Sequence, residues 1–232
     1  MRIRFDMSRN PQSAAYADSM NAALVAGLVA AGARSEDLVG FASKPWTFAC
    51  EGRSGPKGVA KIFSITVSTP DPELGAALLR LNAEEVRCAS SNGDILHLSG
   101  AKRSVLDTSN ARVSEIMVSF ASPVLIPLRK GGAKAYAEDL SEVDLDAALR
   151  VGLERRAGRE MDLRFHVDPL SRMTDVRKRV IPLRKSPKGT IRVPALSFPM
   201  TITGRPEDVE FAFLAGLGAK THAGLGCPVF MK

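Results

Sequence analysis

The sequence predicts an α+β protein made of two ferredoxin-like (RRM-like) units in tandem. The first half of the chain has the order strand, helix, strand, strand, helix, strand, which is the order of a ferredoxin-like unit. From residue 114 a similar but more irregular order begins again. A hydrophobic content of 45% is enough for packed cores. We therefore expect one unit over residues 1–111 and a second over residues 112–232.

The elements of the first half follow from periodicity and from helix-capping residues. Residues 1–7 alternate, with Ile3 and Phe5 on one side, which indicates a half-buried strand. Asn10 and Pro11 suit the N-cap and first position of a helix that would run to Gly32. The other predicted elements are strands over residues 38–50, 60–68 and 95–99, and a helix opened by residues 69–73.

The second half repeats these patterns less regularly. A strand broken by Pro123 is expected near its start, and Ser141 suits the cap of the next helix. A further helix begins at Pro206, because proline suits the first helical turn. The predicted elements are a strand over residues 116–126, a helix over 141–153, a strand over 161–167, extended segments over 176–183 and 189–202, and a terminal strand over 227–231.

The chain ends in a glycine-rich loop between the last helix and the last strand. Two Gly-Leu-Gly triplets, at residues 216–218 and 224–226, bracket Lys220 and His222. Glycine tolerates positive φ and permits close approach of another backbone. We expect the loop to turn sharply against a ligand or another strand, with Lys220 and His222 placed to meet an anion. A P-loop requires strand, loop and then helix, so this order argues against a nucleoside triphosphate site.

The charge of the chain favours an anionic partner. The net charge is +7 and the isoelectric point is near 9.6, which favours nucleic acid over a membrane because no basic amphipathic helix is evident. A basic segment, interrupted by prolines and a glycine, is predicted to form an extended hairpin that contacts RNA phosphates. The alternative is a solvated, charge-protected sheet edge. The basic residues are Arg172, Arg177, Lys178, Arg179, Arg184, Lys185, Lys188 and Arg192.

Cysteine content and hydropathy indicate the cellular compartment in which the protein is expected. Cys50, Cys88 and Cys227 are scattered singly, without metal-ligand spacing, which is typical of a reducing cytoplasm. The N-terminal residues lack the apolar segment of a signal peptide, and no apolar run approaches the length of a membrane span. We expect a cytoplasmic protein that needs no metal and no cofactor.

Three motifs resemble one known family. Besides the glycine-rich loop, residues 44–49 read Lys-Pro-Trp-Thr-Phe-Ala and residues 120–124 read Phe-Ala-Ser-Pro-Val. In this order they resemble the RAMP superfamily, and within it the CRISPR repeat-cleaving endoribonuclease, the sixth Cas protein. The motifs are spread from one end of the chain to the other.

The resemblance implies a reaction, a substrate and partners. It implies binding of the stem-loop in CRISPR precursor RNA and metal-independent cleavage, in which a ribose 2′-OH attacks the adjacent phosphate. The products would carry a 2′,3′-cyclic phosphate and a 5′-OH. Such a reaction needs a base, an acid and positive charge for the phosphorane. The RNA product would stay bound within an effector complex with other Cas subunits.

The candidate site departs from the family pattern. Many members place a histidine between the first helix and the Lys-Pro strand, where residues 33–37 read Ala-Arg-Ser-Glu-Asp here. Arg34 could stabilise the phosphorane, Lys44 could do the same or donate a proton, and Tyr16 could position the 2′-OH. His97 and His166 are read as ordinary strand residues. The resemblance assigns RNA binding to the glycine-rich loop, at Gly216, Gly218, Lys220, His222, Gly224 and Gly226.

Three functions remain open from the sequence. An arginine-based site would cleave slowly, with about one turnover for each bound RNA, which would suit the divergent processing subunits of type IV systems. The missing histidine instead favours a catalytically inactive subunit that binds guide RNA. A third alternative, an enzyme acting on a small anionic metabolite, predicts a closed pocket and no salt-dependent affinity for RNA.

Overall fold

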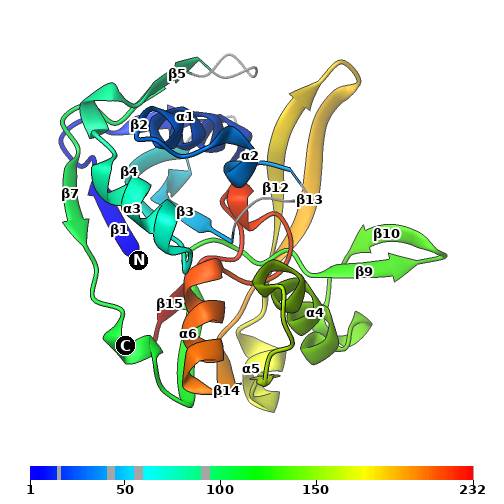
Figure 1. The fold of residues 1–232 in the computed structure, drawn as a ribbon. Coiled ribbons are helices and arrows are strands. Elements are labelled where there is room, and N and C mark those ends of the chain that lie inside the picture. Colours follow the sequence, from blue (N-terminus) through cyan, green and yellow to red (C-terminus); the bar gives the residue numbers. More distant parts are fainter. Residues whose placement is uncertain (15–16, 41–44, 55–59, 90–94, 232) are drawn as a thin grey trace.

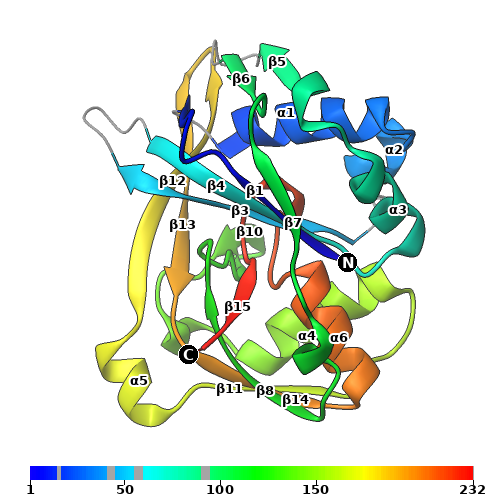
Figure 2. The same ribbon diagram turned by 90° about the vertical axis from the view of Figure 1, so that its left-hand side faces the viewer.

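The computed structural model describes residues 1–14, 17–40, 45–54, 60–89 and 95–231 of the chain. It consists of two tandem ferredoxin-like units, each with an antiparallel sheet and two main helices (Figure 1). Figure 2 shows the layers in order: α1 (Ala17–Ala30), the N-terminal sheet, then α4 (Leu145–Ala157) with α6 (Pro206–Ala215), and the C-terminal sheet. The open face of the N-terminal sheet therefore packs against the helices of the second unit.

The N-terminal sheet has the strand order of a ferredoxin-like unit. Strand β1 (Arg2–Asp6) lies between β4 (Ala60–Ser68) and β7 (Lys102–Val105), and β3 (Thr47–Ser54) is the edge beyond β4. All these pairs are antiparallel, with Ile3 opposite Val67 and Phe5 opposite Ile65. Helices α1 and α3 (Pro72–Arg80) cover the face that carries Ile3 and Phe5, and together they form a continuous buried core.

The C-terminal sheet repeats this order. Strand β8 (Glu115–Phe120) lies between β14 (Met200–Gly204) and β15 (Pro228–Phe230), and β11 (Leu163–His166) is the far edge. Leu149, Phe213 and Ile202 belong to a second buried core between this sheet and its helices. The division after residue 111 stays a prediction.

Three hairpins are added to the two units. Strands β5 (Arg87–Ala89) and β6 (Ile95–His97) precede β7, β9 (Pro127–Lys130) and β10 (Ala133–Tyr136) follow β8, and β12 (Arg177–Ser186) and β13 (Gly189–Ser197) separate β11 from β14. In Figure 1 the β9–β10 and β12–β13 hairpins project on the same side of the molecule. The shorter described elements are β2 (Gln12–Ala14), α2 (Ser35–Leu38) and α5 (Pro169–Thr174), with single 3₁₀ turns η2 (Ala83–Glu85), η3 (Ser109–Ala111), η4 (Leu140–Glu142) and η5 (Thr221–Ala223).

Several expected boundaries in the first half were wrong. Residues 12–14 form β2, because they pair with β4, so the helix begins at Ala17 rather than at Pro11. Leu38 ends the short helix α2, and β3 begins at Thr47; residues 41–44 of the expected strand lie outside the described residues. The strand expected at residues 95–99 is β6 of a hairpin, whereas Lys102–Val105 pairs with β1.

In the second half the pattern was more reliable. The strands at β8 and β11, the basic hairpin and α6 are confirmed. Asp144, rather than Ser141, caps α4 by accepting a hydrogen bond from the N–H of Ala147. The strand expected over residues 116–126 ends at Phe120, and Val124 forms an isolated bridge with Leu196.

Arg2 joins the two units from inside their interface. Its side chain lies on the open face of the N-terminal sheet and is only 3% exposed. The guanidinium donates to the carbonyl oxygen of Pro228 at 2.6 Å and lies 4.7 Å from the ring centroid of Phe213. A hydrogen bond and a cation–π contact therefore replace water around this buried charge.

Asp208 fixes the first turn of α6, the helix that leads into the glycine-rich loop. Its side chain is 0% exposed, and Oδ1 lies 2.5 Å from Arg159 Nη1. Oδ2 accepts from the N–H of Asp162 at 2.9 Å and from Arg205. Burial alone would raise the pKa of Asp208, but the hydrogen bond from Asp162 and the two arginines outweigh it, so its pKa lies below its usual value.

Among the described residues, no helix is both long and apolar enough to cross a membrane.

Replacing Asp208 by asparagine should destabilise the protein by about 3 kcal/mol, because two arginines would lose their buried partner. Since the folded-state pKa is lowered, the contribution of Asp208 is complete above the unfolded pKa of about 4 and disappears as pH falls through the folded pKa. Urea unfolding at several pH values measures both effects. The control is Glu207→Gln, at a half-exposed neighbour, which should change stability by less than about 0.5 kcal/mol. A difference between wild type and Asp208→Asn that stays constant at low pH would contradict this account.

Candidate nucleic-acid interface

The glycine-rich loop, residues 216–227, packs tightly against the protein itself. Gly216, Gly218, Gly224 and Gly226 all have positive φ. A Cβ atom would lie 2.6 Å from Thr47 at Gly216 and 2.5 Å from the Leu125 carbonyl oxygen at Gly218. At Gly224 it would meet the ring of Phe48, and at Gly226 it would lie 1.8 Å from the Leu217 carbonyl oxygen. Of the two expected neighbours, a ligand or another strand, the glycines contact strand β3, the segment at residues 124–125 and their own loop.

Hydrogen bonds hold the loop in this position. Leu217 N–H donates to Gly226 O, which joins the two triplets, and Gly226 N–H donates to Pro123 O. Thr47 Oγ1 donates to the carbonyl oxygen of Leu225, so β3 bonds directly to the loop. The loop therefore packs against side chains of β3, an edge strand of the N-terminal sheet.

Arg156 of α4 supports the loop from the other side. Its guanidinium donates to the carbonyl oxygens of Ala215 and Gly216, each at 2.9 Å, and to Thr221 Oγ1 at 3.0 Å. These carbonyls belong to the last turn of α6, whose backbone acceptors lack helical partners. Burial, with a smaller effect of Arg155, lowers the pKa of Arg156 to about 10, so the side chain remains charged at neutral pH.

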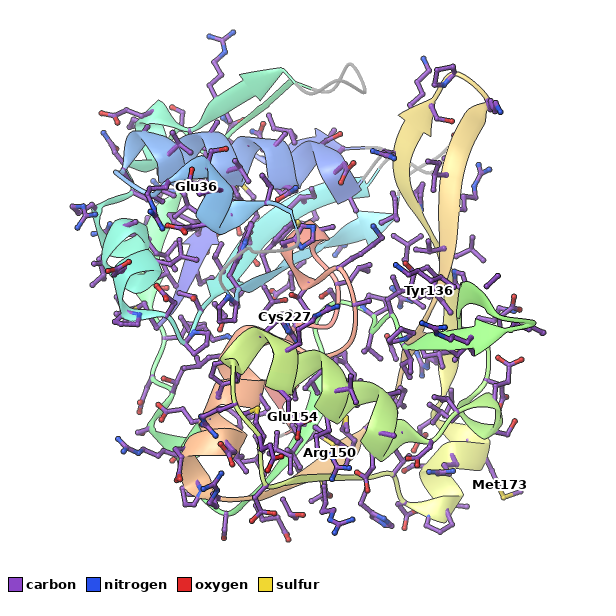
Figure 3. The ribbon with its side chains drawn as sticks, turned by 45° about the vertical axis from the view of Figure 1, so that its right-hand side comes forward. Glu36, Tyr136, Arg150, Glu154, Met173 and Cys227 are labelled. Atoms are coloured by element: carbon purple, nitrogen blue, oxygen red, sulfur yellow. The ribbon has the colours of Figure 1, made fainter. Side chains whose placement is uncertain are left out.

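The loop, α4 and the β9–β10 hairpin enclose a cavity of about 680 Å³, which we call the basic cavity. Figure 3 shows Tyr136 beside the β12–β13 strands, with α4 below the loop. Among the described lining residues the acidic one is Asp71, whose Oδ1 accepts the N–H of Leu74 as the cap of α3. The remaining lining residues are Gly40, Pro45, Trp46, Lys134, Tyr136, Arg155, Arg156, Gly218, Ala219, Lys220, Thr221 and His222.

The cations of this cavity have no carboxylate partners in the described part of the chain. Lys134, Arg155, Arg156 and Lys220 form no ion pair there, whereas Arg34, Arg159 and Arg205 each contact carboxylates. Converging cations without counterions favour an anionic ligand. Lys220 is also the one non-glycine residue of the described chain with positive φ, at +55°, a conformation that costs a non-glycine residue about 1–2 kcal/mol. The close packing of the flanking glycines holds Lys220 in this conformation.

Sequence analysis missed the β9–β10 hairpin, which forms one wall of the cavity. Its turn is Gly131-Gly132, with both φ values positive, which is the pattern of a type I′ hairpin. Arg129 lies directly opposite Lys134 in the ladder, and like charges at such a position repel. Lys134 and Tyr136 share one face of β10 and both line the cavity. The Gly-Gly pair between short basic segments was the signal that could have revealed the hairpin.

The predicted basic hairpin is β12–β13, and its cations are exposed. Arg177, Lys178, Arg179, Arg184, Lys185, Lys188 and Arg192 all lie on its surface. Arg172 lies instead on α5, just before the hairpin. Lys178 forms an ion pair with Glu138, next to β10. Leu183, Val193 and Ala195 are buried on the inner face and hold the hairpin against the loop residue Leu225.

A second hollow, of about 600 Å³, separates the β12–β13 hairpin from the N-terminal sheet. Arg179 lies on its hairpin wall and Arg53 on its β3 wall, and Gly224 and Leu225 form part of its floor. The glycine-rich loop therefore lies between two hollows that both carry cations.

The structure separates Arg34 from the basic cavity. Arg34 lines another hollow, of about 540 Å³, together with Asp37, Glu73 and Arg80. Two hydrogen bonds at 2.8 and 3.0 Å tie its guanidinium to Asp37, which raises its pKa further. Lys44 and Tyr16 lie outside the described residues. Pro45, which follows Lys44 in the chain, lines the basic cavity, and Ala17, which follows Tyr16, lines the second hollow.

His222 is the titratable group of the basic cavity whose usual pKa is closest to neutrality. Burial lowers the pKa of His222, and Lys220 and Arg156 lower it further, whereas Asp18 of α1 opposes them. The imidazole is therefore mostly neutral at pH 7 and can accept a proton. Within the described chain, no three His, Cys, Asp or Glu side chains group closely enough to hold a metal ion.

Comparison with known proteins identifies a family whose model matches this chain. A family model described as CRISPR associated protein Cas6, C-terminal, matches residues 107–229, which is more than half of the 232-residue chain. No curated protein sequence matches the chain.

Solved structures of similar fold include the product of a Cas6-related gene from Pyrococcus furiosus, with a TM-score of 0.73 at 15% identity, covering 100% of this chain and 98% of that chain. A RAMP protein described as binding different RNA substrates gives a TM-score of 0.68 at 15% identity, covering 100% of both chains. A Cas6 product complex gives 0.63 at 17% identity, covering 99% of this chain and 98% of that chain. At these identities the likeness shows the fold.

Replacing Gly226 by alanine should destabilise the protein by about 2–5 kcal/mol, from left-handed backbone strain and from overpacking against Leu217. Gly158 is the matched control, because its φ of +68° is close to the +64° of Gly226 but nothing lies within 4 Å of its would-be Cβ. Gly158→Ala should therefore cost only about 1–2 kcal/mol. Thermal or urea unfolding measures both variants. Equal losses of unfolding free energy in the two variants would show that the close approach of Leu217 to Gly226 does not contribute to the effect of the substitution.

Proposed function

The chain belongs to the CRISPR-associated Cas6 family, and on that premise we propose that it binds the repeat stem-loop of CRISPR precursor RNA and cleaves it. The reaction is a transesterification that uses no metal ion: a ribose 2′-OH attacks the adjacent phosphorus and the 5′-oxygen leaves. The cleaved RNA stays bound, and the protein carries it into an effector complex with other Cas subunits in the cytoplasm.

The observation that carries this proposal is the basic cavity beside the glycine-rich loop. Lys134, Arg155, Arg156 and Lys220 converge there from three parts of the chain without carboxylate partners among the described residues. Positive charge that is already oriented stabilises a phosphorane more than the ground-state phosphodiester, because the transition state carries more negative charge. The same cations would fix the phosphate in line with the attacking 2′-oxygen.

The two projecting hairpins give the RNA a larger basic surface than the cavity alone. The β9–β10 hairpin, which carries Arg129 and Lys134, and the β12–β13 hairpin, which carries the exposed cations, project on the same side of the molecule in Figure 1. Arginine can bond phosphate oxygens in pairs, and such contacts grip a stem-loop by its backbone. The strand faces that bind RNA in RRM domains are not used, because Arg2 and β3 of the open face are covered by the second unit.

Within this proposal the sequence-derived catalytic residues keep their roles. Lys44 protonates the leaving 5′-oxygen, Tyr16 positions the 2′-OH, and Arg34 adds positive charge at the edge of the site. Arg34 would have to exchange its bonds with Asp37 for a phosphate, so we expect Arg34→Ala to have the smallest effect of the three substitutions.

Cleavage of the host's repeat RNA in excess EDTA tests the function. We expect a single cut, with products that end in a 2′,3′-cyclic phosphate and a 5′-OH, and no cut when the attacking ribose is replaced by 2′-deoxyribose. The amount of product should level off near the amount of enzyme, because the product stays bound. Product ends are mapped by treatment with kinase and phosphatase. Salt-sensitive binding without cleavage would make the chain a guide-RNA-binding subunit, and absence of both would refute the proposal.

Removing a cation from the β9–β10 hairpin should weaken binding of RNA and reduce its dependence on salt. For Lys134→Ala or Arg129→Ala we expect the slope of log K against log salt to fall by about one unit. The control is Lys102→Ala, which removes an exposed cation from β7 on the opposite side of the molecule (Figure 1) and should leave the slope unchanged. Binding is measured by filter retention or fluorescence anisotropy between about 50 and 300 mM salt. Equal slopes for all variants would place the RNA elsewhere.

A further inference from the structure

We infer that His222 is the general base of this site, the group that takes the proton from the attacking ribose 2′-OH. The inference rests on the proposed function and deepens it, because the sequence supplies positive charge and an acid but no base. Arg34 stays protonated at any relevant pH and cannot take this role. The geometry of the basic cavity identifies the missing group.

Elimination among the described residues that line the cavity leaves His222. Apart from Asp71, the other polar groups on the cavity wall are guanidinium, ammonium, phenol or hydroxyl groups, which as side-chain types are poor general bases at neutral pH. The carboxylate of Asp71 is a weak base, and it accepts the backbone N–H of Leu74 at 2.8 Å. An imidazole is the remaining side chain that can be unprotonated at pH 7 and still bind a proton strongly enough to act as a base.

The surroundings of His222 keep it neutral until it acts. Lys220 of the same loop and Arg156 of α4 disfavour the imidazolium, and burial does so more strongly than either. Arg155, Lys134 and Tyr136 line the same cavity. Asp18 of α1 acts in the opposite direction and is positioned to stabilise the imidazolium that forms during the reaction. Asp71 is the other carboxylate on the cavity wall.

The loop gives the imidazole a fixed position. His222 lies in the single turn η5 between Gly218 and Gly224, which pack so closely against Leu125 and Phe48 that a Cβ atom at either glycine would not fit. Thr221, its neighbour, accepts the hydrogen bond from Arg156. A catalytic base must lie within hydrogen-bonding reach of the proton it removes, and a rigid turn supplies that positioning before RNA binds.

The step balances without a metal or a co-reactant. The 2′-O–H proton moves to a ring nitrogen of His222 while the 2′-oxygen forms a bond to phosphorus. The bond between phosphorus and the 5′-oxygen breaks, and that oxygen takes a proton from the ammonium group of Lys44. The products are a 2′,3′-cyclic phosphate and a 5′-OH. The imidazolium then returns its proton to solvent, and the neutral amine of Lys44 takes one up to become an ammonium group again.

The test is single-turnover cleavage of the repeat RNA by the full-length protein in EDTA, from about pH 5 to 9, with affinity measured in parallel. His222→Gln preserves size and polarity, and His222→Ala leaves space for a small base. We expect both to lower the rate by about 100-fold or more, with affinity changed by less than about threefold. The wild-type rate should rise with pH to a plateau with a midpoint below about 6.5, and this limb should vanish in both variants. Added imidazole should restore part of the rate of His222→Ala.

The control is His166→Ala, at an exposed position on β11, which should leave rate, affinity and pH profile unchanged. Wild-type rates and an intact acid limb in His222→Gln would overturn the inference while leaving the nuclease function standing. A loss of rate that is matched by an equal loss of affinity would assign His222 to binding and also overturn it. A wild-type protein that binds the repeat without cutting would refute the proposed reaction and this assignment together.

Discussion

The glycine-rich loop passes between its neighbours at distances that leave no room for a Cβ atom. At Gly226 the obstacle is the Leu217 carbonyl oxygen of the same loop, and at Gly216 and Gly224 it is strand β3 of the other unit. The loop can therefore close on itself and cover β3 only if these positions lack side chains. Once it is closed, the bonds from Arg156 and Thr47 reach their acceptors, and the layered arrangement of the two units is fixed.

The ion pairs distinguish the arginines that anchor helix α6 from the arginines of the basic cavity. Asp208 is surrounded by Arg159 and Arg205, and its role is to anchor α6. Around α6, a buried carboxylate therefore neutralises the arginines that contact it. In the basic cavity, by contrast, Arg156 is held by neutral carbonyl oxygens and keeps its charge. A buried charge without a counterion is expensive, and an RNA phosphate that enters the cavity would remove that cost.

The sequence revealed the fold more fully than the site. Alternation and capping were enough for β1, β4, α3, β8 and α6, since those signals are local. They failed at β2, because these residues become a strand through pairing with β4. They also failed at the last strand of the N-terminal sheet, β7, because strand β6 of the inserted β5–β6 hairpin has the same sequence pattern and comes just before it. The basic cavity joins residues 134, 155 and 220, which are far apart in the chain. Only the three-dimensional arrangement shows that Arg156 has no acidic partner among the residues that the structure describes, or that Arg34 is hydrogen-bonded to Asp37.

The glycines of the loop and the two polar residues between them have separate roles, and the distinction matters for reading such sequences. Every glycine is accounted for by contact with protein, so the glycine pattern marks a way of packing two ferredoxin-like units together. In the proposed reaction, the chemistry would come from what the packed loop presents, Lys220 with a positive φ and His222 beside it. A chain could keep all four glycines and the entire fold while losing both side chains, and it would then retain the architecture without the base. Membership of the family and competence for cleavage are therefore separate properties, and under the proposed mechanism the second would depend on the two residues that the glycines enclose.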